Sequence, residues 1–208
     1  MNTSDTIWCS DFMATTTYAK QIDYELTDNS NASRYEGSNA YKAGQQLDAA
    51  HVPLRIFWKH KRIMPSRPKL GDVFWITNAK VIVSEAFKTV LEGFNLGRTR
   101  FFEVPLFDDG EQVADRKFFV LNVAEVAEVG VPEETSGAIL GASGRYMIPG
   151  IKGRKIAANP AAMGQLDLVH DINFGSLIFF SDRLAKAIKA AKIKPLTLVK
   201  CVNDEDTP

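Results

Sequence analysis

The feature that most constrains the fold is a phrase that occurs twice, 97 residues apart. Residues 81–83 (VIV) precede Ser84 and an acid, and residues 178–180 (IFF) precede Ser181 and an acid. A serine in this position is a preferred helix N-cap, and an acid in the first turn complements the helix dipole. Each copy therefore predicts a strand, a capping serine (Ser84 or Ser181) and a helix.

The residues that follow each serine extend the similarity. Apolar residues recur at helical spacing, which marks one buried helix face: Phe87, Leu91 and Phe94 in the first copy, and Leu184, Ile188 and Ala191 in the second. Residues 100–107 (RFFEVPLF) predict a strand, with 117–123 (KFFVLNV) as its hairpin partner. Pro195 is expected to end the second helix before a strand at 196–202. These patterns predict an α+β single domain with mixed or antiparallel sheets and two similar strand–cap–helix–strand units.

The first third of the chain is less regular. Alternation in residues 16–26 predicts a strand with Tyr18, Ile22, Tyr24 and Leu26 on one face. The polar run at 28–39 (DNSNASRYEGSN) predicts a loop, and residues 54–58 (LRIFW) predict a short strand. We expect residues 1–69 to form a partly irregular region of the same domain, 70–202 its core, and 203–208 an acidic flexible tail.

Composition excludes several classes of protein. No run approaches 18 apolar residues, and the first residues lack a secretory pattern, so we expect neither a membrane span nor a signal peptide. The 25 basic and 25 acidic residues cancel, which argues against nucleic acid as the partner. Cys9 and Cys201 are far apart in the sequence and show no metal-ligand spacing. We therefore expect no disulfide framework, and we expect the protein to be cytoplasmic.

The polar motifs offer no recognisable catalytic constellation. The three histidines lack metal-ligand spacing, so we expect no metal, no cofactor and no enzymatic activity. His170, Asp171 and Asp72 are the polar candidates if the chain is an enzyme, but adjacent residues seldom point the same way, which favours a capping or surface role for the first two. Residues 150–153 (GIKG) resemble the GxxG loop of RNA-binding KH domains. Pro149 and the alternation before it favour a solvated hairpin loop instead.

The most distinctive charge feature is a run of bases without an acid between residues 55 and 69. It is either a solvated edge strand and loop, or a docking patch for an acidic protein surface or a phosphate. On the second interpretation Trp58 is an interface anchor. The predicted partner-binding residues are Arg55, Trp58, Lys59, Lys61, Arg62 and Arg67. An unpaired strand at 54–58 could also mediate a homodimer.

Several of these segments resemble a known family. Pro68, Asp72 and residues 81–94 (VIVSEAFKTVLEGF) are similar to the signature of a bacterial immunity-protein family, first catalogued as a domain of unknown function and assigned to polymorphic-toxin systems. FFEVPLF, FFVLNV and LIFFSDRLAKAIKAAKIK resemble its later strands and closing helix. The resemblance covers about 90 of the 208 residues.

This resemblance implies a cytoplasmic protein that protects its producer by binding a cognate toxin, often one delivered by a contact-dependent secretion system. The region 1–69 is then a sensible place for partner specificity, since it lies outside most of the resembling motifs. Two other classes stay open: a small enzyme that reverses a toxin's modification, and a nucleic-acid-binding module that uses 55–69 and 150–155.

Overall fold

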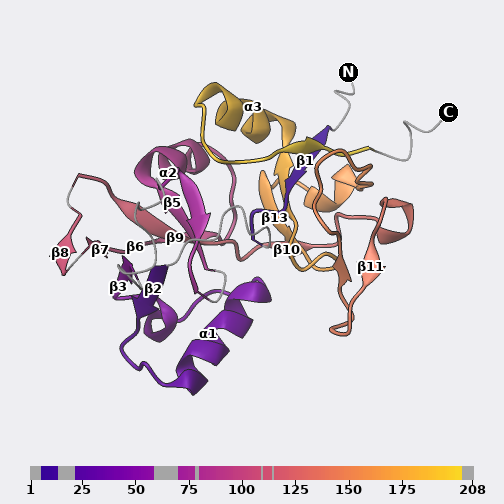
Figure 1. Ribbon diagram of the computed structural model, residues 1–208. Helices are drawn as coiled ribbons and strands as arrows, with labels where there is room; N and C mark the ends of the chain where they lie inside the picture. The colour runs from indigo at the N-terminus through magenta and orange to yellow at the C-terminus, as the bar shows by residue number, and fades with distance from the viewer. Residues whose placement is uncertain are drawn as a thin grey trace.

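The computed structural model describes residues 6–13, 22–58, 70–77, 80–108, 110–113 and 115–202. These residues form an α+β fold in one domain (Figure 1). The α-helices are α1 (Asn31–Lys42), α2 (Glu85–Glu92) and α3 (Asp182–Ala190), and 3₁₀ turns are formed by Ala49–His51, Pro132–Glu134 and Pro160–Met163.

The strands of the first half are β1 (Ile7–Ser10), β2 (Ile22–Glu25), β3 (Arg55–Trp58), β4 (Val73–Trp75), β5 (Val81–Ser84), β6 (Arg100–Glu103) and β7 (Leu106–Asp108). Those of the second half are β8 (Glu111–Gln112), β9 (Phe118–Asn122), β10 (Val126–Ala127), β11 (Ile139–Leu140), β12 (Tyr146–Met147), β13 (Leu168–Asp171), β14 (Ile178–Ser181) and β15 (Val199–Lys200). They form four sheets, with strand orders β10-β13-β14-β1-β15, β4-β5-β9-β6, β2-β3-β7-β8 and β11-β12.

Two of these sheets contain the two similar units. The first unit runs β4, β5, α2, β6, and the second runs β13, β14, α3, β15. In each sheet a strand from elsewhere is inserted before the last strand: β9 lies between β5 and β6, and β1 lies between β14 and β15. The register keeps the sequence offset, because Phe102 faces Val120 in one sheet and Val199, 97 residues later, faces Cys9 in the other.

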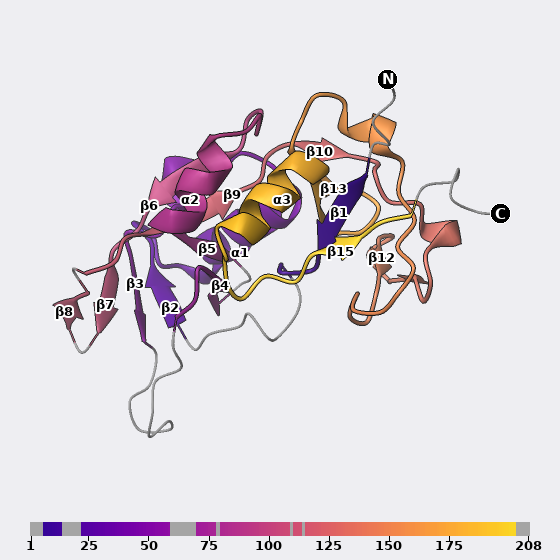
Figure 2. The same cartoon turned by 90° about the horizontal axis from the view of Figure 1, so that it is seen from above.

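The two helices of the units pack against each other and against their own sheets. α2 and α3 lie side by side (Figure 2). Phe87 and Leu91 of α2 and Leu184 and Ile188 of α3 are buried in one continuous apolar core. These four residues of the predicted apolar stripes thus form the face that holds the units together, whereas Ala191, predicted on the same face, follows α3 and is exposed. A second core, around Phe174, lies beside the second unit.

Residues 31–42 form α1, so the loop predicted at 28–39 is wrong. The helix begins after Ser30, whose side chain accepts a hydrogen bond from the Ser33 N–H at 3.2 Å. Its buried face consists of Gly37, Ser38 and Tyr41, which gives almost no apolar periodicity. Gly37 allows close packing, since an added Cβ would lie 2.8 Å from the Cβ of His51. Tertiary packing therefore forms this helix where the local pattern indicates a loop.

The strand predicted at 54–58 is present as β3, but it is neither an edge strand nor unpaired. It lies between β2, which is antiparallel to it, and β7, which is parallel to it. This pairing removes the basis for a homodimer formed through that strand. The single strand predicted at 100–107 is divided around Pro105 into β6 and β7, which belong to different sheets, and β6 pairs with β9 as expected.

Candidate functional site

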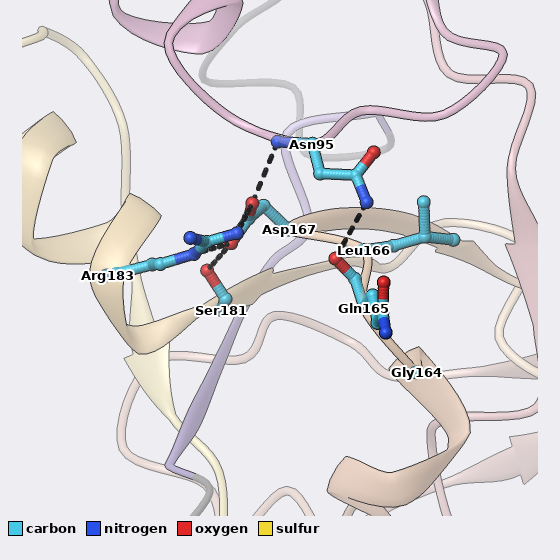
Figure 3. A pocket seen from close by; sticks show the side chains of 7 residues that line it. All are labelled: Asn95, Gly164, Gln165, Leu166, Asp167, Ser181 and Arg183. Carbon is cyan, nitrogen blue, oxygen red and sulfur yellow. Dashed lines mark hydrogen bonds and ion pairs between the residues drawn. The ribbon is translucent and has the colours of Figure 1, made fainter.

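A polar cluster around Asp167 lines a cavity of about 410 Å³ at the end of the second unit (Figure 3). Asp167 precedes β13, Ser181 ends β14 and Arg183 lies in the first turn of α3. Arg183 donates from Nε at 2.6 Å and from Nη2 at 2.5 Å to the Asp167 carboxylate. Ser181 Oγ also donates to this carboxylate, and the backbone N–H of Asn95 donates to it at 2.9 Å.

These contacts determine what the carboxylate can do. Asp167 is 1% exposed, whereas the Arg183 side chain is 66% exposed. Burial opposes ionisation of Asp167, but the hydrogen bonds from Arg183, Ser181 and Asn95 outweigh it and hold its pKa below the usual value. The group is therefore an ionised carboxylate whose oxygens are occupied by donors. It is poorly suited to act as a general base.

The first unit contains the same arrangement around Asp72. Ser84 Oγ donates to the Asp72 carboxylate at 2.8 Å, and the backbone N–H of Lys194 donates to it at 3.0 Å. Asn95 follows α2 and Lys194 follows α3, so each unit's aspartate binds the backbone that leaves the other unit's helix. The residue of the first unit that corresponds to Arg183, 97 positions earlier, is Ala86. This reciprocal exchange makes the cavity a structural junction between the units.

Each capping serine has two roles in this junction. Ser84 Oγ accepts a hydrogen bond from the Phe87 N–H, and Ser181 Oγ accepts one from the Leu184 N–H, both at 3.2 Å. The same hydroxyl also donates to the aspartate. Each serine therefore connects the start of its helix to the loop before the first strand of its unit, which is β4 or β13.

The predicted partner-binding residues are only partly described. Arg55 lies on β3, where its Nε donates to the Glu25 carboxylate at 2.5 Å and its guanidinium lies 5.5 Å from the Phe107 ring centroid. Trp58 ends β3 and is opposite Ile22. The other four, Lys59, Lys61, Arg62 and Arg67, lie outside the described residues. The partner-binding assignment stays a prediction.

The polar candidates for an enzyme have separate partners. Asp171 is buried and accepts backbone hydrogen bonds from Val129, Gly130 and Phe174 at 2.6–2.8 Å. Burial raises its pKa despite these bonds. His170 is buried with Nε2 3.3 Å from the Gly175 carbonyl oxygen, and burial lowers its pKa. A surface role for the pair is thus wrong, and Asp171 organises a turn. Asp72, the third candidate, is bonded to Ser84 and to the backbone of Lys194 as described above.

The two cysteines are free and buried. They lie next to each other although 192 positions separate them in sequence, and a hydrogen bond with Cys9, together with burial, raises the pKa of the Cys201 thiol. Within the described ranges no three histidine, cysteine, aspartate or glutamate residues gather as a metal site would require. The described helices also include none with the length and apolar character needed to cross a membrane.

The GIKG segment does not have the context of a KH loop. Residues 150–153 form a turn after β12, with Ile151 buried, and no α-helix adjoins the turn on either side. Gly150 and Gly153 have φ angles of 71° and 75°, which suit glycine. This segment is a structural turn.

Two clefts beside α1 were not predicted from the sequence. One, of about 610 Å³, lies between the end of α1 and the β11–β12 hairpin, and its lining includes Lys42 and Arg145. The other, of about 560 Å³, lies between α1 and the Ala49–His51 turn and includes Tyr35. Sequence reasoning missed both because it placed a loop where α1 lies.

The fold is an α+β domain in which Asp72 and Asp167 hold two similar units together. Comparison with known families identifies the class further. The model of an immunity protein family, Imm11, matches residues 12–203 of the chain. The chain therefore belongs to the Imm11 immunity protein family. No curated protein matches it.

Proposed function

We propose that the chain binds a cognate bacterial toxin in the cytoplasm of its producer and neutralises it by direct protein–protein inhibition, as part of a polymorphic-toxin system. The observation that carries this proposal is the family match over residues 12–203. The structure supports a binding role, because Asp72, Asp167 and Asp171 are engaged in hydrogen bonds that hold the fold.

The basic segment 55–69 is one proposed contact for the toxin. Its cations would attract an acidic toxin surface, and complementary charge accelerates association and restricts partner choice. The proposed division into a specificity region, 1–69, and a core, 70–202, predicts that charge reversal in the first region changes toxin binding while the protein stays folded. Lys59, Lys61 and Arg62 to glutamate is the variant that tests this contact.

Stoichiometry tests the proposed function. A candidate toxin domain is produced in a non-native host with and without the chain, and growth, complex size and affinity are measured. We expect rescue of growth and a discrete complex with the toxin, and protection in a purified toxin assay that requires about one copy of the chain per toxin. Absence of a complex together with absence of rescue would refute the proposal.

The same titration separates the two other classes. An enzyme that reverses a toxin's modification would protect at ratios far below one to one and without a stable complex. A nucleic-acid-binding module would bind a generic oligonucleotide with a steep dependence on salt. Either result in place of stoichiometric inhibition would replace the proposed function.

A further inference from the structure

Exposed apolar side chains occur mostly on two elements, α1 and the β11–β12 hairpin, and one of them, Met147, lines the cleft between these elements. Large apolar residues on a protein surface mark interaction sites when they gather rather than scatter. Among the described residues, six large apolar residues are exposed, and four of them lie on these two elements. Their exposed fractions are 71% for Tyr35, 54% for Ile139, 59% for Leu140 and 56% for Met147. Ile139 and Met147 are cross-strand partners, so their side chains share one face of the hairpin.

The cleft between these elements is cationic. Lys42, in the last turn of α1, and Arg145, just before β12, are the two charged residues that line it. Arg145 Nη1 donates to the Lys42 carbonyl oxygen at 3.0 Å, which ties the hairpin to the helix and fixes the guanidinium at the cleft. An added Cβ at Gly175, which also lines the cleft, would lie 2.9 Å from Arg145 Cδ, so the arginine side chain packs against Gly175.

The surroundings extend this site along α1. Asn39 and Ala43 line both this cleft and the second cleft, so α1 is a ridge with a depression on each side. Tyr35 lines the second depression. α1 lies on the side of the molecule away from α2 and α3 (Figure 1). A partner can therefore cover this surface without disturbing the junction of the two units.

We propose that the cleft between α1 and the β11–β12 hairpin is the principal toxin-contact site, and that it takes an acidic side chain of the toxin flanked by apolar residues. This proposal rests on the proposed function and names the surface that performs it. The toxin carboxylate pairs with Arg145 and Lys42, and its apolar neighbours pack on Ile139 and Met147. Arginine suits a planar, bidentate pairing with a carboxylate.

The apolar residues decide between protein and nucleic acid as the occupant. A phosphate backbone would use the two cations but would leave Ile139 and Met147 against water or ribose. A protein with an acidic residue inside an apolar patch satisfies both components of the surface. Arginine is enriched among the residues that contribute most to affinity, and such residues lie near the centre of an interface, surrounded by contacts that exclude water.

The test uses the full chain and a toxin domain against which the chain protects a producing cell. Affinity is measured by calorimetry for the wild type, for K42E/R145E and for I139S/M147S. We expect K42E/R145E to bind about 100-fold more weakly, because repulsion replaces two attractive pairs, and I139S/M147S to bind about 10-fold more weakly. The matched control is R100E/K117E, which changes the same net charge at exposed positions on β6 and just before β9. It should bind within about threefold of the wild type.

Hydrogen exchange of the complex locates the interface without mutation. Protection of residues 35–43 and 139–147 is expected, and circular dichroism shows that each variant is folded. Equal binding by the wild type and K42E/R145E, or protection confined to 55–69, would overturn the cleft proposal and leave the proposed function intact. Failure of the wild type to bind would overturn the proposed function itself. An oligonucleotide that binds the wild type but not K42E/R145E, with no toxin binding at the cleft, would replace the acidic protein as its occupant.

Discussion

Lys80 precedes β5 and has no exposed surface, which makes it the most informative residue for testing the energetics of this core. Its Nζ lies 3.4 Å from the Tyr24 hydroxyl and 4.6 Å from the centroid of the Tyr24 ring. Burial lowers the pKa of Lys80 from 10.5 to about 8, and the charges of Arg34 and Lys42 act in the same direction. We predict that Lys80→Met stabilises the protein at pH 7.

The magnitude follows from the pKa. A decrease from 10.5 to about 8 corresponds to about 3 kcal/mol of unfavourable free energy for the charged form. Loss of the contact between the ammonium and the Tyr24 ring offsets about 1 kcal/mol of this. The net gain at pH 7 is therefore about 2 kcal/mol, which for a domain of this size raises Tm by about 4–8 °C.

The dependence on pH gives the prediction its sign. Below pH 8 Lys80 is protonated in the folded and the unfolded states, so the penalty is complete. Between pH 8 and 10.5 the unfolded state binds more protons, so this penalty declines as the pH rises. The advantage of Lys80→Met should thus be constant from pH 6.5 to 7.5 and smaller at pH 9.5.

Urea unfolding of both proteins from pH 6.5 to 9.5 measures this difference, and subtraction cancels the groups that they share, including Cys201. Lys152→Met, at an exposed lysine, should change stability by less than about 0.5 kcal/mol. A Lys80→Met protein that is less stable than the wild type at pH 7, with a difference that does not vary with pH, would refute the reasoning.

Three further predictions concern the junction, α1 and the thiols. Asp167→Asn should cost about 2 kcal/mol in urea unfolding, and more than Asp72→Asn, since only the first carboxylate pairs with an arginine; the contribution of Asp167 should decline as pH falls below about 4, because its folded-state pKa is lowered. Gly37→Ala should lower Tm although alanine favours helices, because its Cβ would lie 2.8 Å from the Cβ of His51; an unchanged or higher Tm would contradict this packing. Cys201 should react with Ellman's reagent only after unfolding, since it is buried with a raised pKa, and rapid native labelling would contradict this.

The two units could be predicted from the sequence because their signals are local. Ser84 and Ser181 each stand between an apolar strand and an amphipathic helix, and period and capping identify such elements. The reciprocal junction could not be predicted in this way. Asn95 and Asp167 are 72 positions apart, and Asp72 and Lys194 are 122 apart. Nothing in the local pattern distinguishes an aspartate that binds distant backbone from one that faces water.

The α1 cleft could not be predicted for a related reason. α1 buries Gly37, Ser38 and Tyr41, and two of these residue types are more typical of loops than of a helix core. Its stability depends on packing rather than on its own periodicity. The cleft then depends on Arg145, which is 103 positions from Lys42. The charge run at 55–69 can be recognised in the sequence because it is contiguous. Lys42 and Arg145 cannot be recognised as a pair in this way, because only the fold brings them together.

The placement of exposed apolar residues relative to the units has a consequence for how partner choice could change. Tyr35, Ile139, Leu140 and Met147 lie outside the units formed by β4–β6 and β13–β15 with their helices. The units contain the paired aspartates, the capping serines and the contact between α2 and α3. Substitution at surface residues with few structural contacts typically changes stability by less than about 0.5 kcal/mol. Residues such as Ile139 and Met147 can therefore vary with the partner while the junction stays fixed. On this view, exchanging residues 139–147 between two members of the family should transfer toxin preference without loss of folding. A hybrid that keeps its original preference would place specificity elsewhere, and residues 1–69 would then be the next region to exchange.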